Sequence, residues 1–263
     1  MNKKALCIGI NDYPGTDSDL QGCVNDASDW AAELTRRGYA VSRLTDAQAT
    51  KAAMVAAMRG LIGGAQSGDS LVITYSGHGT WVPDSSGDEP DGRDEGLCPY
   101  DIRTAGPLLD DEIRVLFAAR SQGVRLVLIS DSCHSGSVTR GSEEGLDANG
   151  PRARFLPLAA WMPEAELPRA GRRPATLVSG LRRAGGELLL AGCHDTEYSW
   201  DTSFQGRPNG AFTYYALKTL RERNPATYEA WFNAVREFLP STRLPQAPQI
   251  LGSATERRLA VLA

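Results

Sequence analysis

The sequence predicts an α/β fold in which a mainly parallel central sheet is flanked by helices on both faces, a three-layer sandwich. Two observations predict it. Five short runs are mostly apolar without strict alternation, which is typical of strands whose two faces are both covered by helices. Longer segments between them place apolar residues at helical spacing, so strands and helices alternate along the chain. Hydrophobic residues make up 41% of the 263, enough for a sizeable core.

The expected elements follow one another in chain order. The apolar runs that we interpret as buried strands cover residues 5–10, 39–44, 70–76, 125–131 and 187–192. The segments with helical spacing cover residues 23–37, 50–62, 210–222 and 226–238, and a further helix carries Ile113, Leu116 and Phe117. Asp110 and Asp111 lie where a capping residue would begin that further helix. The stretches 77–109 and 137–186 have no strong apolar periodicity, and loops of such length are often functional.

Charge and cysteine usage exclude several classes of protein. The net charge of -4 is unfavourable for general binding of nucleic acid. The five cysteines are an odd number at wide spacing without a CxxC pair, which argues against a disulfide framework and a structural zinc site. The apolar run near the N-terminus is short for a secretory signal, and no run approaches the ~20 apolar residues of a membrane span. We therefore expect a cytoplasmic protein with no nucleic-acid or membrane partner.

Two candidate catalytic residues follow neighbouring strands of the predicted sheet. His78 lies between two glycines after the third strand, and Cys133 lies in a Ser/Gly-containing turn after the fourth. Open α/β sheets bind ligands beyond the carboxyl ends of their strands, so both residues are expected at one edge. A thiol attacks a carbonyl as a thiolate or with a base close by, and histidine is such a base. We expect the flanking small residues to leave the sulfur and the imidazole ring accessible.

Each candidate also has a structural interpretation. A lone buried cysteine is more often an inert core residue, which describes Cys7 well, and a lone histidine near a strand end is often structural. The joint placement of His78 and Cys133 favours the functional interpretation. His134 adjoins the candidate nucleophile and is interpreted as a supporting residue. His194 follows Cys193, yet no HxxxH or CxxC spacing supports a zinc site there.

Eight motifs, in order along almost the whole chain, resemble one peptidase family. The histidine and cysteine motifs, TYSGHGT (74–80) and ISDSCHSG (129–136), are similar to those of caspase-like peptidases. The narrower resemblance is to the metacaspases and their bacterial relatives, the orthocaspases. The motifs that carry it are LQGCVNDA (20–27), GDEPDGRDEGLCPYD (87–101), LLDDEI (108–113), AGCHDTEYSWD (191–201), GAFTYYAL (210–217) and PQAPQILG (245–252).

This resemblance implies a caspase-like fold and a cysteine endopeptidase with Cys133 as nucleophile and His78 as acid and base. Backbone amides near Gly79 and Cys133 would form the oxyanion hole. Metacaspases cleave after Arg or Lys, which implies protein or peptide substrates with such a residue before the scissile bond. The positions that match their acidic pocket are Asp26 and Asp131, with Cys23 and Ser76 beside them and Asp201 near the substrate groove. The resemblance also implies a monomer.

Elementary electrostatics agrees with an acidic pocket. Two carboxylates near a nucleophile are costly unless a cation offsets them, and a guanidinium does so with bidentate hydrogen bonds. The alternatives stay open at this point, because Asp26 is also explained as a solvated acid near a helix start and Asp131 as a residue that orients its turn. The rival functions are a catalytically silent caspase-fold module that binds basic peptides and a protease of different specificity.

Residues 84–112 hold ten acidic residues against two basic ones. Oxygen ligands suit calcium, although the spacing is not that of an EF-hand, and a solvated acidic loop is the simpler interpretation. The metacaspase resemblance favours a calcium site, because many members of the family need calcium. The positions that match the family's ligands are Asp94, Asp110 and Asp111, and Glu95 is a weaker candidate.

The chain is predicted to form one peptidase domain over residues 1–263, with a larger catalytic part (1–136), an arginine-rich linker (137–186) and a smaller C-terminal part (187–263). An enzyme that cuts after arginine would find sites in its own linker, and we hypothesise that part of the linker blocks the groove until it is cut or displaced. The sequence does not identify the cut site. The linker arginines are Arg140, Arg152, Arg154, Arg169, Arg172, Arg173, Arg182 and Arg183.

Overall fold

The computed structural model describes residues 1–84, 92–133, 150–167, 187–194 and 197–263. Its centre is a six-stranded sheet with the order β12-β9-β7-β3-β1-β2. All neighbouring strands are parallel except β12, which pairs antiparallel with β9 at one edge. The strands are β1 (Lys3–Gly9), β2 (Ala40–Thr45), β3 (Ser70–Ser76), β7 (Arg125–Asp131), β9 (Leu188–Ala191) and β12 (Gln249–Leu251).

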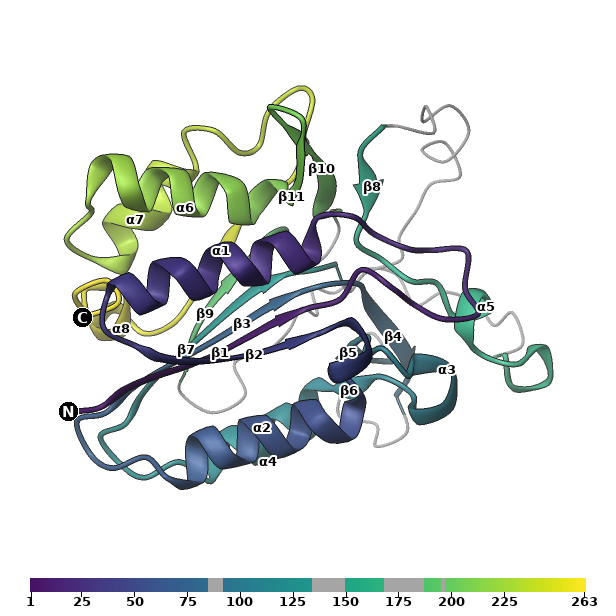
Figure 1. The fold of residues 1–263 in the computed structure, drawn as a ribbon, viewed down its shortest axis with the longest axis horizontal. Helices are drawn as coiled ribbons and strands as arrows, with labels where there is room; N and C mark the ends of the chain where they lie inside the picture. Colours follow the sequence, from purple (N-terminus) through teal and green to yellow (C-terminus); the bar gives the residue numbers. More distant parts are fainter. Residues whose placement is uncertain (85–91, 134–149, 168–186, 195–196) are drawn as a thin grey trace.

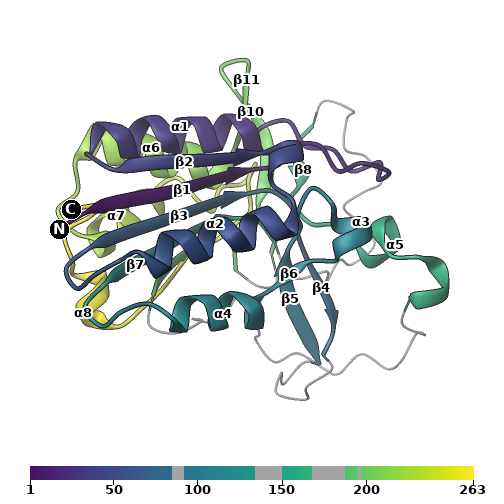
Figure 2. The same cartoon turned by 60° about the horizontal axis from the view of Figure 1, so that its bottom comes forward.

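Helices cover both faces of this sheet, as Figures 1 and 2 show. The helices α1 (Cys23–Arg36), α6 (Ala211–Arg223) and α7 (Tyr228–Val235) lie on one face, and α2 (Lys51–Gly63) and α4 (Asp110–Ala118) lie on the other. Two apolar cores result, one on each side of the sheet. Met58 of α2 and Phe117 of α4 are buried in the first core, and Trp30 of α1 packs edge-on against Trp231 of α7 in the second.

The predicted strands and helices are all present, with ends displaced by a few residues. Two details of the prediction are wrong. The strand β2 is half-exposed rather than buried, because it lies at the edge of the sheet and has a neighbour on one side only. Asp110 and Asp111 do not cap α4; they form its first turn, and the cap position is Leu109, whose N–H donates to the Glu112 carboxylate at 3.0 Å.

Two small antiparallel sheets were not predicted from the sequence. One consists of β4 (Gly79–Pro83), β5 (Arg93–Leu97) and β6 (Leu108–Leu109), and the other of β8 (Arg152–Ala153), β10 (Trp200–Phe204) and β11 (Arg207–Gly210). Their strands are short and pair with distant segments, so they carry no periodicity. The remaining short elements are the helices α3 (Ile102–Ala105), α5 (Leu158–Trp161) and α8 (Ala254–Arg257) and the 3₁₀ turns η1 (Asp46–Gln48) and η2 (Glu164–Glu166).

Parts of both stretches that look irregular in the sequence therefore belong to β-structure at the carboxyl ends of the central strands. Figure 1 shows β8 beside β10 and β11 at this end of the molecule, away from both termini. Within the described residues no helix has the length and apolarity that a bilayer crossing requires.

Candidate active site

Two tyrosines fix the backbone of His78 just beyond β3. The His78 N–H donates to the Tyr13 hydroxyl at 2.7 Å, and the Tyr75 hydroxyl donates to the His78 carbonyl at 2.6 Å. A Cβ on Gly77 would lie 2.6 Å from both hydroxyl oxygens, so the glycine at this position is needed for the close approach of the two tyrosines. The backbone of His78 is thus held by buried side chains on both of its polar groups.

The environment of the His78 ring determines which nitrogen carries a proton. Nε2 lies 2.6 Å from the backbone carbonyl oxygen of Ser18, and a carbonyl only accepts, so Nε2 is the protonated nitrogen. Nδ1 is left with a lone pair and has no hydrogen-bond partner among the described residues. The pKa of His78 is lowered to about 4: burial is the largest cause, the Ser18 carbonyl opposes it, and the positive charge of Arg154 adds to the lowering. The ring is neutral at pH 7 and able to take a proton on Nδ1.

Cys133 lies two residues beyond the end of β7 and is fully buried. Its thiol contacts the backbone of Ser199: it donates to the carbonyl at 3.4 Å and accepts from the N–H. A second thiol is close by. The hydrogen bond of Cys193 with Cys133 raises the pKa of Cys193 far above its usual range, with burial as a further cause, so Cys193 remains protonated.

Three carboxylates from different parts of the chain surround one buried guanidinium. The Arg154 guanidinium lies 2.7 Å from Asp26 of α1, 3.3 Å from Asp131 of β7 and 3.1 Å from Asp201 of β10. The side chains of Arg154 and Asp26 are completely inaccessible to solvent. The structure therefore brings Asp26, Asp131 and Asp201 together in one acidic pocket, and an arginine of the linker fills it.

Backbone groups at helix starts hold these carboxylates in place. Asp26 accepts from the N–H of Gly210, which precedes α6, and Asp131 accepts from the Thr213 N–H in the first turn of that helix. Asp201 accepts from the N–H of Gly22, which precedes α1. Helix N-termini favour negative charge, so the fold itself stabilises an acidic pocket here. A Cβ on Gly210 would approach to 2.2 Å of Asp131 and 2.5 Å of Arg154, so the pocket has no room for a larger residue.

The charges in the pocket shift the pKa of Asp26 in opposite directions. Burial raises the pKa of Asp26, the Arg154 guanidinium acts against this rise, and the neighbouring Asp131 adds to it. Cys23 lies in the same field: burial raises the pKa of its thiol well above the usual range, while Arg154 opposes the rise. Ser76 pairs in register with Asp131 and is buried beside it. The pKa of Asp26 is raised to about 7 even with the guanidinium beside it, because burial is the largest influence on this carboxyl.

The backbone of Arg154 is bound as tightly as its side chain. Its carbonyl oxygen accepts from the N–H of Gly79 at 3.0 Å and from the N–H of Cys133 at 3.1 Å, and its own N–H donates to Ser199 at 2.9 Å. On the amino side, Arg152–Ala153 form β8 and pair antiparallel with β10. On the carboxyl side, the Leu156 N–H donates to the Gly79 carbonyl at 2.9 Å. Residues 152–156 therefore cross the site as one extended segment.

This segment explains why two predictions about accessibility are wrong. Cys133 is 0% exposed and His78 is 2% exposed, whereas the flanking small residues predicted an accessible sulfur and ring. The segment 152–156 lies over both residues and uses the amides of Gly79 and Cys133 as donors. The small residues beside His78 and Cys133 leave room for the linker backbone to approach. The segment 152–156 then covers the sulfur and the imidazole ring that these small residues would otherwise leave accessible.

The predicted calcium ligands lie apart from this pocket. Asp94 and Glu95 belong to β5, and Asp110 and Asp111 begin α4. The pairing of Gly96 with Leu109 brings the two pairs of acids onto neighbouring segments. Asp111 also forms an ion pair with Arg114 one helical turn away. Among the residues that the structure describes, no group of three or more His, Cys, Asp or Glu side chains could hold a metal ion, so this part alone does not form a complete ligand set.

Some predicted residues fall outside the described residues. They are His134 and the linker arginines Arg140, Arg169, Arg172, Arg173, Arg182 and Arg183. His194 is described, just beyond β9, and belongs to no potential metal cluster within the described part.

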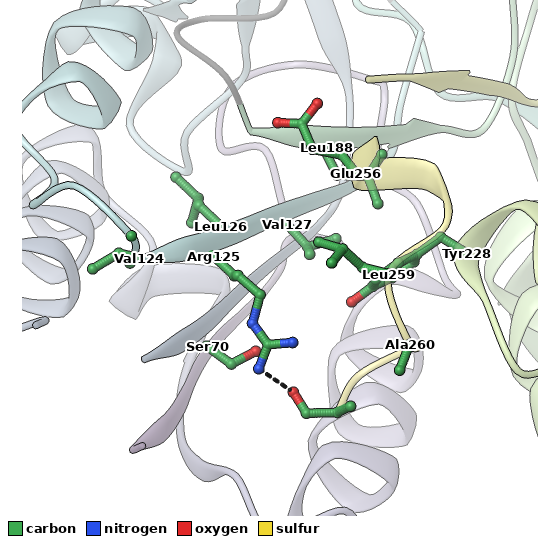
Figure 3. A pocket seen from close by; sticks show the side chains of 12 residues that line it. Ser70, Val124, Arg125, Leu126, Val127, Leu188, Tyr228, Glu256, Leu259 and Ala260 are labelled. Carbon is green, nitrogen blue, oxygen red and sulfur yellow. Dashed lines mark hydrogen bonds between the residues drawn. The ribbon is translucent and has the colours of Figure 1, made fainter. Parts of the chain in front are cut away.

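A separate pocket of about 200 Å³ lies at the opposite end of the strands (Figure 3). Ser70 and Arg125, the first residues of β3 and β7, help to line it, together with Tyr228 and Leu259. Arg125 donates there to the carbonyl of Ala263 at 2.9 Å. The pocket contains neither Cys133 nor His78, so the site under the linker segment is the candidate active site.

Several functional residues were not identified from the sequence. Ser199 binds both Cys133 and Arg154, Tyr13 and Ser18 orient His78, and Asn209 donates to Asp26 at 2.8 Å. Arg154 was only one of eight linker arginines. The signal nearest to it is the mostly apolar run FLPLAAWM (155–162) that follows it directly.

Comparison with known proteins identifies the family. A model of the metacaspase peptidase C14 domain matches residues 3–140. The proteins named metacaspase-1 from Mycosarcoma maydis and from Emericella nidulans are each 34% identical to the chain, over 95% of this chain and 70% of theirs. The chain belongs to the metacaspase family. This metacaspase is accordingly a cysteine peptidase, a hydrolase that acts on proteins or peptides.

Solved structures support the fold of the metacaspase. A protein of Geobacter sulfurreducens superposes with a TM-score of 0.76 and is 28% identical, covering 100% of this chain and 99% of its own. Caspase-1 of Spodoptera frugiperda superposes with a TM-score of 0.57 at 11% identity, covering 95% of this chain and 86% of its own, which supports the fold alone. The predicted family and the predicted caspase-like fold are confirmed.

The tyrosines that hold His78 allow a test of its positioning. Tyr13→Phe leaves the His78 N–H without its acceptor, and an unsatisfied buried donor costs about 1–3 kcal/mol in the free energy of unfolding. We expect kcat to fall about tenfold or more, because the ring is displaced, and KM to stay unchanged, because the acidic pocket is intact. Urea unfolding and steady-state kinetics measure both. Tyr100→Phe, on a partly buried tyrosine elsewhere, is the matched control, and an unchanged kcat in Tyr13→Phe would contradict the assignment.

Proposed function

We propose that this metacaspase is an endopeptidase that cleaves after arginine, with Cys133 as nucleophile and His78 as acid and base. One observation carries the proposal: an arginine already lies in the site in the pose of a substrate. The Arg154 guanidinium contacts three carboxylates, while its carbonyl oxygen accepts from the amides of Gly79 and Cys133. Two convergent N–H donors on a carbonyl oxygen, beside a cysteine, are the arrangement that acyl transfer requires.

The proposed mechanism is acyl transfer from the arginine carbonyl to Cys133. The Cys133 thiol gives its proton to Nδ1 of His78 and the sulfur attacks the carbonyl carbon, and the negative charge that develops on the oxygen is stabilised by the two amides. The C–N bond then breaks as His78 returns the proton to the leaving amine, which leaves a thioester on Cys133. Water attacks the thioester with His78 as base, and the new carboxyl end is released with the thiol restored.

The pocket favours arginine over lysine and excludes aspartate before the scissile bond. The guanidinium of Arg154 donates to Asp26 and Asp201 and also to the backbone carbonyl of Asp131, three acceptors in different directions. A planar fork of five donors can satisfy all of them, whereas an ammonium is a point charge. An acidic side chain would add a fourth negative charge to a buried site, which is strongly unfavourable.

The substrate backbone is expected to bind as an added strand. β8 occupies the edge of β10 through the pairs Ala153–Trp200 and Arg152–Asp201. A peptide substrate that replaces β8 would use the same backbone hydrogen bonds before its scissile bond, as in other peptide-binding proteins that extend a sheet. Sequence preference would then come mainly from the arginine pocket.

We also propose that calcium stimulates the enzyme and that the enzyme processes its own linker. Support for calcium is limited to the acids of β5 and α4, which lie on neighbouring segments and supply the oxygen ligands that calcium prefers. Calcium bound by these acids would join β5 to the start of α4, next to β4, the strand that begins at Gly79. A monomeric state and a cytoplasmic location stay predictions from the sequence.

Peptide hydrolysis tests the proposed specificity. Fluorogenic peptides that end in Arg, Lys or Asp are offered to the wild type and to Arg154→Gln, which vacates the pocket. We expect cleavage after Arg to exceed cleavage after Lys, no cleavage after Asp, and complete loss in Cys133→Ala. Asp26→Asn should lower kcat/KM for the Arg peptide about 100-fold or more, because a buried guanidinium loses a charged partner.

Asp29→Asn is the matched control for the pocket. Asp29 lies on the same helix and pairs with Arg207 at a partly exposed position, so its loss should change kcat/KM little. Preference for Asp before the scissile bond would overturn the pocket assignment. Binding of Arg peptides without turnover in wild type and Arg154→Gln would favour a silent binding module instead.

The two titrating groups predict that acidification changes KM and kcat at different pH values. His78 has a pKa of about 4, so kcat should stay level from neutral pH downward and fall as the pH approaches 4, where the base becomes protonated. The raised pKa of Asp26 means that it takes up a proton at a higher pH than ordinary carboxyls, and a neutral Asp26 binds the guanidinium more weakly. KM for the Arg peptide should therefore rise with acidification before kcat falls. Steady-state kinetics across the range measures both, and a KM independent of pH would contradict the role of Asp26.

Chelation tests the proposed role of calcium. We expect EDTA to lower the rate on the Arg peptide and added calcium to restore it, and we expect Asp110→Asn to raise the calcium concentration needed for half-maximal rate. Glu164→Gln, on an acid outside the predicted ligand set, should respond like the wild type. A rate that is the same in EDTA and in calcium would show that these acids form only a solvated surface.

A further inference from the structure

We propose that Gln246 is a positioning residue for the nucleophile of this metacaspase. Its buried side-chain amide fixes Ser199, whose backbone contacts both the Cys133 sulfur and the arginine in the pocket. The inference rests on the proposed function, because it requires Cys133 to act as the nucleophile. It also gives a task to the motif PQAPQILG (245–252), which the proposed function leaves without one.

Ser199 contacts three parts of the site at once. Its N–H donates to the sulfur of Cys133, and its carbonyl accepts from the Arg154 N–H at 2.9 Å. Its hydroxyl donates to a carboxylate oxygen of Asp131, one of the three acids around the guanidinium. Ser199 is fully buried, so bulk water cannot replace a partner that is lost. A displacement of Ser199 therefore reaches the nucleophile directly and reaches the pocket through Asp131.

The contact with the sulfur matters for the chemistry. When the Cys133 thiol gives up its proton, the sulfur can no longer donate to the Ser199 carbonyl, but it still accepts from the Ser199 N–H. Hydrogen bonds to charged groups are stronger than bonds between neutral groups. The Ser199 N–H is therefore placed to hold the sulfur while its charge changes during the attack.

The backbone of Ser199 does not tie this residue to the central sheet. Ser199 lies between the end of β9 at Ala191 and the start of β10 at Trp200, outside both strands. Its N–H and carbonyl both bond to groups of the active site, namely Cys133 and the occupant Arg154. Segments outside strands and helices open more easily than the elements that they connect. The position of Ser199 therefore depends on side chains that reach it from elsewhere in the chain.

Gln246 reaches the segment 192–200 at both of its ends. The side-chain nitrogen donates to the Gly192 carbonyl at 2.8 Å and to the Ser199 hydroxyl at 3.4 Å. The side-chain oxygen accepts from the Trp200 N–H at 3.1 Å. Gln246 is 0% exposed, and a buried amide with donors and acceptor all engaged has a fixed orientation. One planar group thus sets the distance between the two ends of the segment.

The part of the chain that carries Gln246 is itself attached to the central sheet. The strand β12 begins at Gln249 and pairs antiparallel with β9. The Ala247 N–H donates to the Glu197 carboxylate, which is a second tie to the segment 192–200. Gln246 therefore has a fixed position relative to the sheet, and its amide imposes that position on the segment.

Gln246→Ala tests the positioning role. Without the amide, the Gly192 carbonyl and the Trp200 N–H lose their partner, and the segment shifts relative to the sulfur. Because small misplacements of reacting groups are costly in rate, we expect kcat on the Arg peptide to fall about 30-fold. KM should rise by no more than about threefold, because Asp26 and Asp201 keep their own backbone donors. Steady-state kinetics measures both values.

Gln249→Ala is the matched control. This glutamine belongs to the same motif, and its side chain donates to the Ala247 carbonyl within that motif. Its kcat and KM should equal those of the wild type. All variants are compared in the background that hydrolyses the Arg peptide, which is either the wild-type chain or Arg154→Gln.

Gln246→Glu gives a readout that a purely structural role would not move. A carboxylate can accept from Trp200 but cannot donate to the Gly192 carbonyl, whereas a neutral carboxyl does both. Burial and the nearby carboxylates of Asp131 and Glu197 raise the pKa of a carboxyl at this position. We expect kcat of this variant, relative to wild type at the same pH, to rise about tenfold from about pH 8 to about pH 5.5. Gln246→Ala should show a constant ratio over this range.

Circular dichroism and urea unfolding report whether each variant is folded. If Gln246→Ala fails to fold, Gln246→Glu carries the test through its pH dependence, because it keeps the size of the side chain. A folded Gln246→Ala with wild-type kcat, or with a change in KM alone, would overturn the positioning role. The same kcat ratio for Gln246→Glu at both pH values would overturn it as well.

The outcomes separate this inference from the proposed function. If the parent chain hydrolyses the Arg peptide and Cys133→Ala does not, the peptidase stands whatever the Gln246 variants do. If the folded wild type and folded Arg154→Gln both leave the Arg peptide whole, the proposed function fails, and the positioning role of Gln246 fails with it.

Discussion

The active site depends on the balance between buried carboxylates and one guanidinium. Asp26, Asp131 and Asp201 come from α1, β7 and β10, and without a cation the burial of three carboxylates side by side would be costly. The Arg154 guanidinium removes that cost, and amides at the starts of α1 and α6 share in it. The pocket is thus stable when an arginine fills it, which links recognition of substrate to the stability of the fold around it.

The same charge also acts on His78, the proposed catalytic base. The positive charge of Arg154 contributes to the lowered pKa of His78, so an arginine in the pocket favours the neutral ring that can accept the thiol proton. Burial is the larger cause, and it depends on the segment that carries the arginine. The pocket and the proposed dyad therefore influence one another, because the charge that satisfies the carboxylates also lowers the pKa of His78.

The scaffold places these groups by joining two kinds of β-structure. In the parallel sheet, His78 and Cys133 lie beyond the carboxyl ends of two adjacent strands, β3 and β7. The small sheet of β8, β10 and β11 adds Asp201, and β10 offers an edge on which an extended peptide can pair. In the intact chain the linker itself takes that edge, so the surface that would recognise a substrate also holds the segment that excludes it.

The sequence by itself determined the sheet and the helices and indicated His78 and Cys133 as the proposed dyad, because apolar runs, helical spacing and the position of these two residues after strands are local patterns. It also indicated Asp26 and Asp131 through the family resemblance. The tertiary structure alone decided which arginine fills the pocket, that Ser18 sets the proton position on His78, and that the dyad is covered rather than exposed. These features depend on contacts between segments far apart in the chain, such as Arg154 with Asp26, and short strands and single side-chain pairs leave no periodic signal in a sequence.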